Sequence, residues 1–359
     1  MPPDADTPHG VVAAQPTIAL AGREDASLTN GLLQLRVEER LDGLYACEAT
    51  FGNWGPVGQH SDFLYFDRRT LDFGRELAVR LRQDTLFSGR VTGLRADFRE
   101  GAPPAIVVLA EDRFQDLRMT RRTRTFADLA DADVIRRIAG EHSLGADVTV
   151  SGPTHKLLAQ LNQSDLAFLR ERARAIDAEV WIEDGRLRAR THRDRGGARL
   201  RLAYGHELRE LEIAADLAHQ RTAIDVAGWD VAAKEPLREQ ADDGVLGAEL
   251  GQQQSGGAIL KQAFGERRET VAHAVPLTSA EARARVEAIF RRQARRFVAG
   301  RAVAETDARL RVGASVTLDG LGPLFGGDYY VTECVHRFDR ARGQRTELAV
   351  ERPGLGRPA

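Results

Sequence analysis

Alternation of apolar and polar positions dominates the first third of the chain. Apolar side chains occupy every second position at Tyr45, Cys47, Ala49 and Phe51. A second run repeats the pattern at Leu77, Val79 and Leu81. A period of two places one set of side chains on a buried face and the other in water, as in a half-buried strand. Short runs of this kind, separated by turn sequences such as Leu41-Asp42-Gly43, predict a β-barrel or sandwich over residues 17–117.

Helical spacing replaces this alternation at about residue 118. Asp131 can cap a helix whose apolar stripe is Val134, Ile135, Ile138 and Ala139. Ser164 is expected to open a second helix, and Asp184-Gly185 predicts a hairpin turn between two short strands. Residues 118–198 are therefore predicted to form a small α/β domain.

Alternation returns in two separate stretches, 199–232 and 300–352. Between them, residues 233–299 are predicted to form an inserted loop and helix domain. Its helix begins with a capping box, Thr278 to Glu281, and is expected to end at Gly300. The two stretches predict a second barrel that this insertion splits. Residues 1–16 are predicted to be disordered, and 353–359 to form a short tail.

Two stretches of the chain, 74–98 and 313–338, follow one pattern. Each opens with a glycine, has apolar residues three and five positions later, and then reads Leu-Phe-x-Gly before Val-Thr. In each stretch a phenylalanine, Phe98 or Phe338, follows that valine by seven positions. The alternatives are a duplicated unit and a chance resemblance between two hairpins. Duplication predicts a mixed β-rich α+β fold with two related antiparallel β-barrels, the second one split, and that the two stretches superpose.

The composition narrows the class of protein. The chain has 359 residues, enough for two to four domains, and its 51 Lys and Arg nearly balance its 53 Asp and Glu. Balanced charge argues against a general polyanion binder. Cys47 and Cys334 are too few for a disulfide scaffold or a cysteine-based metal site. No signal peptide or membrane-spanning run is evident, so we expect a soluble protein made in the cytoplasm, with no membrane insertion.

No motif predicts catalysis, a cofactor or a metal. His206-Glu207-Leu208-Arg209-Glu210 begins like a zinc-protease helix but lacks the second histidine. Gly320-Leu321-Gly322 misses the spacing of a dinucleotide-binding loop. His142, close to a predicted helix end, is expected to act as a cation favoured by the helix dipole. His336 is expected to be a hydrogen-bonded, half-buried core residue on the same side of its strand as Cys334.

Seventeen residues in four ordered segments carry a resemblance to a known family. They are Phe87, Gly89 and Val91; Asp112, Leu117 and Ile135; Ser164, Asp165, Phe168 and Leu169; and Gly313, Phe325, Gly327, Tyr330, Val331, His336 and Phe338. In order and spacing these segments resemble the phage late control gene D proteins, which are baseplate hubs of contractile tails. They are also similar to the N-terminal hub region of VgrG spike proteins.

The resemblance implies a fold and a role. It implies two related β-barrels with α/β insertions, assembled as a homotrimer whose pseudo-sixfold ring joins a tail tube to a trimeric spike. The implied partners are a tail-tube protein, a separate spike or tip protein and baseplate wedge proteins, without cofactor, catalysis or specific nucleic acid. The sequence stops soon after Val331-Thr332, which places it nearer the gene D type than VgrG. The particle would be a phage tail or a phage-tail-like injection system.

Two other classes of function remain open from the sequence. One is a tail-associated cell-wall hydrolase, although no acid pair stands out as catalytic. The other is a β-barrel protein that binds nucleic acid or carbohydrate. The balanced charge and the low aromatic content, 6% of residues, weigh against recognition by stacking.

Overall fold

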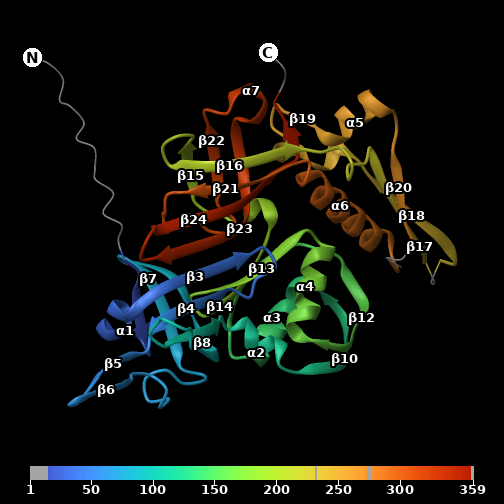
Figure 1. The fold of residues 1–359 in the computed structure, drawn as a ribbon. Coiled ribbons are helices and arrows are strands. Elements are labelled where there is room, and N and C mark those ends of the chain that lie inside the picture. Colours follow the sequence, from blue (N-terminus) through green and yellow to red (C-terminus); the bar gives the residue numbers. More distant parts are fainter. Residues whose placement is uncertain (1–14, 231–232, 273–275, 357–359) are drawn as a thin grey trace, which may run out of the picture.

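One large antiparallel sheet forms the centre of the protein (Figure 1). The computed structural model describes residues 15–230, 233–272 and 276–356. Most of the N-terminal segment predicted to be disordered, and the end of the predicted tail, lie outside the described residues. The large sheet joins the N-terminal and C-terminal parts of the chain, while two smaller structural groups, an α/β group and an insertion, lie beside it.

The N-terminal part of the chain supplies one half of the large sheet, which we call the first unit. Its strands run in the order β3-β4-β9-β8-β7-β1. Their bounds are β1 (Thr17–Leu20), β3 (Leu32–Arg40), β4 (Ala46–Gly52), β7 (Glu76–Leu81), β8 (Asp84–Asp97) and β9 (Ala105–Glu111). Three shorter elements, β2 (Arg23–Glu24), β5 (Trp54–Val57) and β6 (His60–Phe63), and the helix α1 (Ala26–Gly31) complete this region. The continuous apolar run of β9 fits its central place between β4 and β8.

The C-terminal part supplies the other half, the second unit. Its strands run in the order β16-β21-β24-β23-β22-β15. Their bounds are β15 (Arg199–Ala203), β16 (Leu208–Ala215), β21 (Val298–Ala304), β22 (Ser315–Asp319), β23 (Gly327–Asp339) and β24 (Gly343–Arg352). The strand orders of the two units match position by position. They differ at one end, where β15 runs parallel to β22 but β1 runs antiparallel to β7.

Hydrogen bonds show that the repeated sequences are built alike. The N–H of Gly74 donates to the carbonyl of Val91 at 2.8 Å, and the N–H of Gly313 donates to that of Val331 at 2.9 Å. Each valine is followed by a β-bulge at a threonine, Thr92 or Thr332. The two threonine hydroxyls donate to equivalent carbonyls on the next strand, at 3.3 and 3.2 Å. The predicted β-rich α+β fold with two related antiparallel units is therefore confirmed. Among the described residues, no strand pairing joins β3 to β1, the first and last strands of the first unit.

One detail of the predicted repeat is wrong. Leu77 lies opposite Gly89, whereas the equivalent Val316 lies opposite Tyr329. Gly89 therefore corresponds to Tyr329 rather than to Gly327. The cause is a short helix, α7 (Gly322–Phe325), which takes up the Leu-Phe pair of the second unit before β23 begins.

Residues between the two units form a mixed α/β group. Its elements are α2 (Phe114–Arg118), β10 (Arg121–Ala130), α3 (Asp131–Glu141), β11 (Gly145–Thr149), β12 (Thr154–Ser164), α4 (Asp165–Ala175), β13 (Ala178–Glu183), β14 (Arg186–Thr191) and η1 (His192–Asp194). The Ser164 hydroxyl accepts from the N–H of Ala167 at 3.2 Å, which confirms the predicted start of α4. Asp131 does not cap α3, contrary to expectation, because it is the first helical residue and its carboxylate binds His155 and Arg172.

The insertion within the second unit carries its own sheet and a long helix. Its elements are β17 (Ala223–Asp230), β18 (Glu235–Ala241), η2 (Asp243–Val245), η3 (Gly247–Glu249), β19 (Gln254–Ser255), α5 (Gly256–Phe264), β20 (Arg268–Val271) and α6 (Ser279–Arg295). β17 pairs with β18 and β20 rather than with the large sheet, although it lies before residue 233, where the sequence places the start of the insertion. The predicted cap at Thr278 is confirmed, but α6 ends at Arg295 and Gly300 lies inside β21. β25 (Gly354–Leu355), in the predicted tail, pairs with β19.

Each structural group has its own cluster of buried apolar side chains. The first unit, the α/β group, the second unit and the insertion hold one cluster each. Some side chains pack in the cluster of another group: among the described buried residues, Trp181 of β13 and Phe338 of β23 belong to the first-unit cluster. Side chains from neighbouring groups thus complete the first core.

Candidate functional site

Eight strands of the large sheet form a continuous band, β16-β21-β24-β23-β3-β4-β9-β8. The two units meet in the middle of the band, where β23 pairs with β24 on one side and with β3 on the other. Residues opposite each other in neighbouring strands point to the same side. One side of the band covers the apolar clusters, and the other, which we call the charged face, carries mostly polar side chains.

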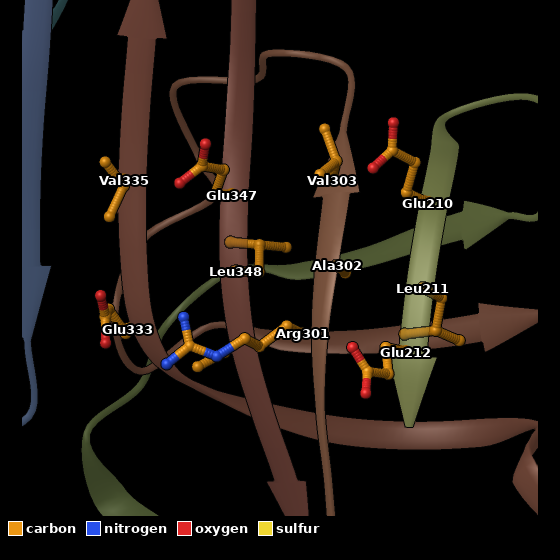
Figure 2. Close-up of a pocket in the computed structure, with 11 residues that line it drawn as sticks. Glu210, Leu211, Glu212, Arg301, Ala302, Val303, Glu333, Val335, Glu347 and Leu348 are labelled. Atoms are coloured by element: carbon orange, nitrogen blue, oxygen red, sulfur yellow. The ribbon is translucent and has the colours of Figure 1, made fainter. Parts of the chain in front are cut away.

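The charged face of the second unit contains a hollow of about 370 Å³ (Figure 2). Two cross-strand rows of side chains point into it. One row consists of Val335, Glu347, Val303 and Glu210, and the other contains Glu333, Arg301 and Glu212. Four carboxylates thus surround one arginine. The lining contains no serine, cysteine, histidine or lysine, so its ionisable side chains are the four carboxylates and the arginine.

The equivalent positions of the first unit carry different charges. Arg36 takes the place of Glu212, and Glu48 takes the place of Arg301. The guanidinium of Arg95, which stands where the second unit has Val335, lies 2.7 Å from the Glu48 carboxylate. The two units therefore share a backbone plan but present opposite charges at the centre of their charged faces.

A buried ion network joins three of the structural groups. Glu179 of β13 lies 2.7 Å from His192 and 2.6 Å from Arg195, and accepts a hydrogen bond of 2.8 Å from the Tyr330 hydroxyl of β23. Arg195 also donates to the hydroxyl of Tyr45 at 2.7 Å. Burial alone would raise the pKa of Glu179, but the hydrogen bond from His192 and the charge of Arg195 lower it to about 2. This carboxylate is a fixed anion that ties the groups together.

A second network, the His155 clamp, joins the α/β group to the insertion. It consists of His155, Asp131, Arg172 and Glu281. The imidazole of His155 lies 2.9 Å from the Asp131 carboxylate through Nε2 and 2.7 Å from the Glu281 carboxylate through Nδ1. Arg172 donates to Asp131 at 2.6 Å. Glu281 belongs to α6, so the clamp fixes the N-terminal turn of that helix against the α/β group.

The C-terminal turn of α6 is held by a third buried ion pair. Both terminal nitrogens of Arg295 donate to Asp177 at 2.6 Å, and Arg295 also donates twice to Glu249 at 2.8 Å. Arg295 is only 3% exposed. Together with the His155 clamp, this pair fixes both ends of the helix.

The motif residues of the first unit and the α/β group are distributed over their cores. Phe87 and Val91 lie in the first cluster, and four more lie in the second cluster: Leu117, Ile135, Phe168 and Leu169. A Cβ atom on Gly89 would collide with the carbonyl oxygen of Glu111. Ser164 caps α4, and the neighbouring Asp165 binds Arg124 at 2.8 Å.

Asp112 fixes the end of β9 to the start of β4. Its two carboxylate oxygens accept from the N–H groups of Tyr45 and Phe114, both at 2.9 Å. Burial outweighs these hydrogen bonds and raises the pKa of Asp112 to about 7. Its role in the structure is to connect strands, because both of these partners are backbone groups.

The motif residues of the second unit are also mainly packing residues. Val331 lies in the third cluster, and Phe325 packs against that cluster. Gly313 and Gly327 have positive φ angles of 93° and 121°, which favour glycine. Tyr330 belongs to the Glu179 network. The structure does not gather the seventeen motif residues into one pocket.

Two histidine predictions can be compared with the structure. His336 is hydrogen-bonded, with Nδ1 3.0 Å from the Thr346 hydroxyl, but it is 2% exposed and so fully rather than half buried. The reason is the β23–β3 junction, which covers this part of β23 from the first unit. His142 does lie at the end of α3, where its Nε2 is 2.8 Å from Asp165.

Within the described ranges, no three His, Cys, Asp or Glu side chains are arranged to hold a metal ion. None of the helices in the same part of the chain combines the length and apolarity that crossing a bilayer requires.

Solved structures with the same fold come from phage tails and a secretion system. A 43 kDa tail protein of prophage MuSo2 from Shewanella oneidensis aligns with a TM-score of 0.71 at 11% identity, over 94% of this chain and 98% of that chain. A tail protein from Neisseria meningitidis MC58 gives 0.67 at 12% identity, covering 95% and 97%. An E. coli component of the type VI secretion system gives 0.58 at 12% identity, covering 95% and 79%.

The fold is thus a phage-tail-protein fold. A search of curated proteins gave no match to this sequence. The family model described as the Alg8 N-terminal domain matches residues 58–339, and the chain belongs to that family.

Proposed function

We propose that this protein is a structural baseplate hub of a contractile phage tail or a phage-tail-like injection system. Three copies would form a ring in which six related sheet units surround a central opening. One rim of the ring would bind the sixfold tail tube and the other a trimeric spike, with wedge proteins outside. The assembled particle is then the place where the protein acts.

The observation that carries this proposal is the duplication of the sheet unit. Both units have the same strand order, the same hydrogen bonds at Gly74 and Gly313 and the same bulges at Thr92 and Thr332. A chain with two equivalent units can contribute two of six positions in a ring, so three copies match sixfold and threefold partners together. The similar solved structures described as phage tail proteins support a role in the same kind of particle.

We propose further that the role is non-catalytic. The buried carboxylates of Glu179, Asp131 and Asp177 are all bound by cations, and the four glutamates of the hollow lie around Arg301. The domain boundaries predicted from the sequence are also proposed, with the start of the insertion set earlier so that the insertion includes β17. Incubation with purified peptidoglycan should leave its turbidity unchanged, and clearing would contradict the non-catalytic role.

Mass and shape test the hub directly. Light scattering should give three times the chain mass of 39.5 kDa. Electron microscopy should show rings with six similar lobes and threefold symmetry. A particle that stays monomeric at the highest concentration reached would contradict the hub.

A further inference from the structure

A second cleft, which we call the arginine cleft, lies where all four parts of the molecule meet. It has a volume of about 510 Å³, and its lining includes residues of the first unit, the α/β group, the insertion and the second unit. The α/β group contributes the second half of α4 and the start of β13, and the insertion contributes the C-terminal turn of α6. Concave sites of this size commonly hold small molecules.

Positive side chains dominate the arginine cleft. Five of its lining residues are arginines: Arg170, Arg174, Arg292, Arg295 and Arg296. They come from α4 and from the end of α6, two helices that both terminate at the cleft. A helix dipole favours cations at its C-terminus, so each helix end stabilises its own arginines. The meeting of the two ends then brings the two sets together.

Three of the four acidic side chains in the lining are already engaged. Asp42 lies 3.5 Å from Arg170, and Asp177 lies 2.6 Å from Arg295. Glu179 belongs to the buried network described above. These contacts account for two of the five arginines and leave three.

The remaining arginines, Arg174, Arg292 and Arg296, make no ion pair with a carboxylate in the described part of the chain. Arg174 and Arg296 are exposed and Arg292 is half-buried, so all three can be reached by a ligand. Burial lowers the pKa of Arg292; the charges of Arg174 and Arg296 act in the same direction, while Asp177 opposes them. An anion bound among these like charges would remove their mutual repulsion.

The fourth acid of the lining, Glu351 of β24, also has no ion pair with a described residue. Burial raises its pKa, although the positive charges of His192, Arg295 and Arg296 oppose the shift. The protonated carboxyl can donate a hydrogen bond to an anion in the cleft, whereas the ionised carboxylate would repel one. Glu351 therefore adjusts the affinity of the cleft and does not neutralise its arginines.

We propose that the arginine cleft binds a small anion with two or more linked phosphate groups, held by Arg174, Arg292 and Arg296. A guanidinium is planar and can donate two parallel hydrogen bonds to phosphate oxygens. Because the three guanidiniums come from two helices, a ligand with several oxygens can engage both sides and link the insertion to the α/β group. The cleft is complete within one chain, so this inference goes beyond the proposed hub and does not depend on it.

Calorimetric titration of the full chain with sodium pyrophosphate tests the site. Binding should saturate at one pyrophosphate per chain and weaken as sodium chloride is added, because salt screens the charges. Inorganic phosphate should bind at least about tenfold more weakly, because a single phosphate leaves part of the arginine set without a hydrogen bond. An absence of saturable pyrophosphate binding would overturn the proposal.

Two substitutions change the affinity in opposite directions. Arg292→Gln should weaken pyrophosphate binding at least about tenfold, because it removes a charge-assisted hydrogen bond. Glu351→Gln should tighten binding at alkaline pH, because it removes the acid that would repel the ligand. Arg342→Gln, on the exposed turn between β23 and β24, is the matched control and should bind as wild type does. Equal affinity of wild type and Arg292→Gln would contradict the assigned site.

Hydrogen exchange locates the bound anion. Pyrophosphate should increase protection in peptides that cover residues 170–180 and 289–296, and should leave the α1 peptide, residues 26–31, unchanged. Protection that appears only outside these two segments would place the ligand elsewhere and overturn the proposal.

Citrate separates phosphate recognition from the docking of an acidic protein segment. It should bind more weakly than pyrophosphate at equal ionic strength, because each carboxylate offers two acceptor oxygens and each phosphate three. Equal binding of citrate would overturn the phosphate class. The hub is tested separately: a monomer that binds pyrophosphate would contradict the hub alone, and a trimer that does not bind it would contradict this inference alone.

Discussion

The His155 clamp predicts a specific loss of stability when its imidazole is replaced. His155 is 4% exposed and holds two carboxylates from different structural groups, at 2.9 and 2.7 Å. His155→Gln retains a single amide donor group and removes the positive charge. Breaking a buried ion pair costs about 3–5 kcal/mol. We expect about 3 kcal/mol, because Asp131 retains its bond to Arg172.

The loss should depend on pH in a defined direction. Burial alone would lower the pKa of His155, but its hydrogen bonds to Asp131 and Glu281 outweigh burial and raise that pKa. The stabilisation is therefore complete below the unfolded pKa of about 6.5 and is lost as the pH rises through the folded value. The same bonds, from His155 to both acids and from Arg172 to Asp131, outweigh burial and lower the pKa values of Asp131 and Glu281. Their contribution is present above about pH 4 and is lost on acidification.

Hydrogen exchange of the α6 peptide, residues 279–295, measures this contact locally. At about pH 6, near the unfolded pKa of histidine, His155→Gln should lower its protection about 100-fold, which corresponds to about 3 kcal/mol. The difference from wild type should shrink steadily towards alkaline pH, after correction for intrinsic exchange rates. His206→Gln, on an exposed turn, is the control. An equal difference at all pH values would refute the assigned imidazolium.

Three further predictions concern other buried positions. Arg295→Met leaves the buried carboxylate of Asp177 without its cation and should lower the free energy of unfolding by about 3–5 kcal/mol, measured by urea unfolding. An unchanged midpoint would contradict this. Gly89→Ala drives a Cβ atom into the carbonyl oxygen of Glu111 and should cost about 1–3 kcal/mol in thermal unfolding, so wild-type stability would rule out the close contact. Burial lowers the pKa of His336 to about 4, so stability is complete above pH 6.5 and falls by about 3 kcal/mol as the pH drops to 4. His336→Asn should reduce this loss of stability between pH 6.5 and 4. An unchanged loss would show that another group causes it.

The sequence predicted the duplication because both hairpins need the same side chains in the same places. Val91 and Val331 are buried at equivalent positions, and each is followed by the bulged threonine. The capping residues Ser164 and Thr278 were also predictable, because a cap depends on neighbours within a few positions.

Local pattern could not decide which sheet a strand joins. Ile224 and Val226 of β17 alternate as a barrel strand would, yet β17 pairs within the insertion. Gly300 was expected to stop a helix, but it is needed in β21, where a Cβ atom would lie 2.7 Å from the carbonyl oxygen of Glu212. Both choices depend on which segments meet in space.

The buried ion networks were missed for a related reason. His155 and Glu281 are 126 positions apart, and Arg195 and Tyr45 are 150 apart. No local spacing links such residues. The one available signal was the position of Glu179 itself, a charged residue between the buried apolar Ala178 and Val180. An ionised group in that setting requires a cationic partner.

In the proposed ring, the sixfold tube and the threefold spike would recognise different features of the two units. Backbone features that both units keep, such as the hydrogen bonds at Gly74 and Gly313, recur six times, so a sixfold partner can bind only through what the units share. Side chains that differ recur three times. Around the central opening, the Arg36 and Glu48 positions of one unit would alternate with the Glu212 and Arg301 positions of the next. A threefold spike can distinguish these two charge patterns, whereas a sixfold tube must tolerate both. Exchanging the charges of one unit alone should therefore weaken spike binding more than tube binding.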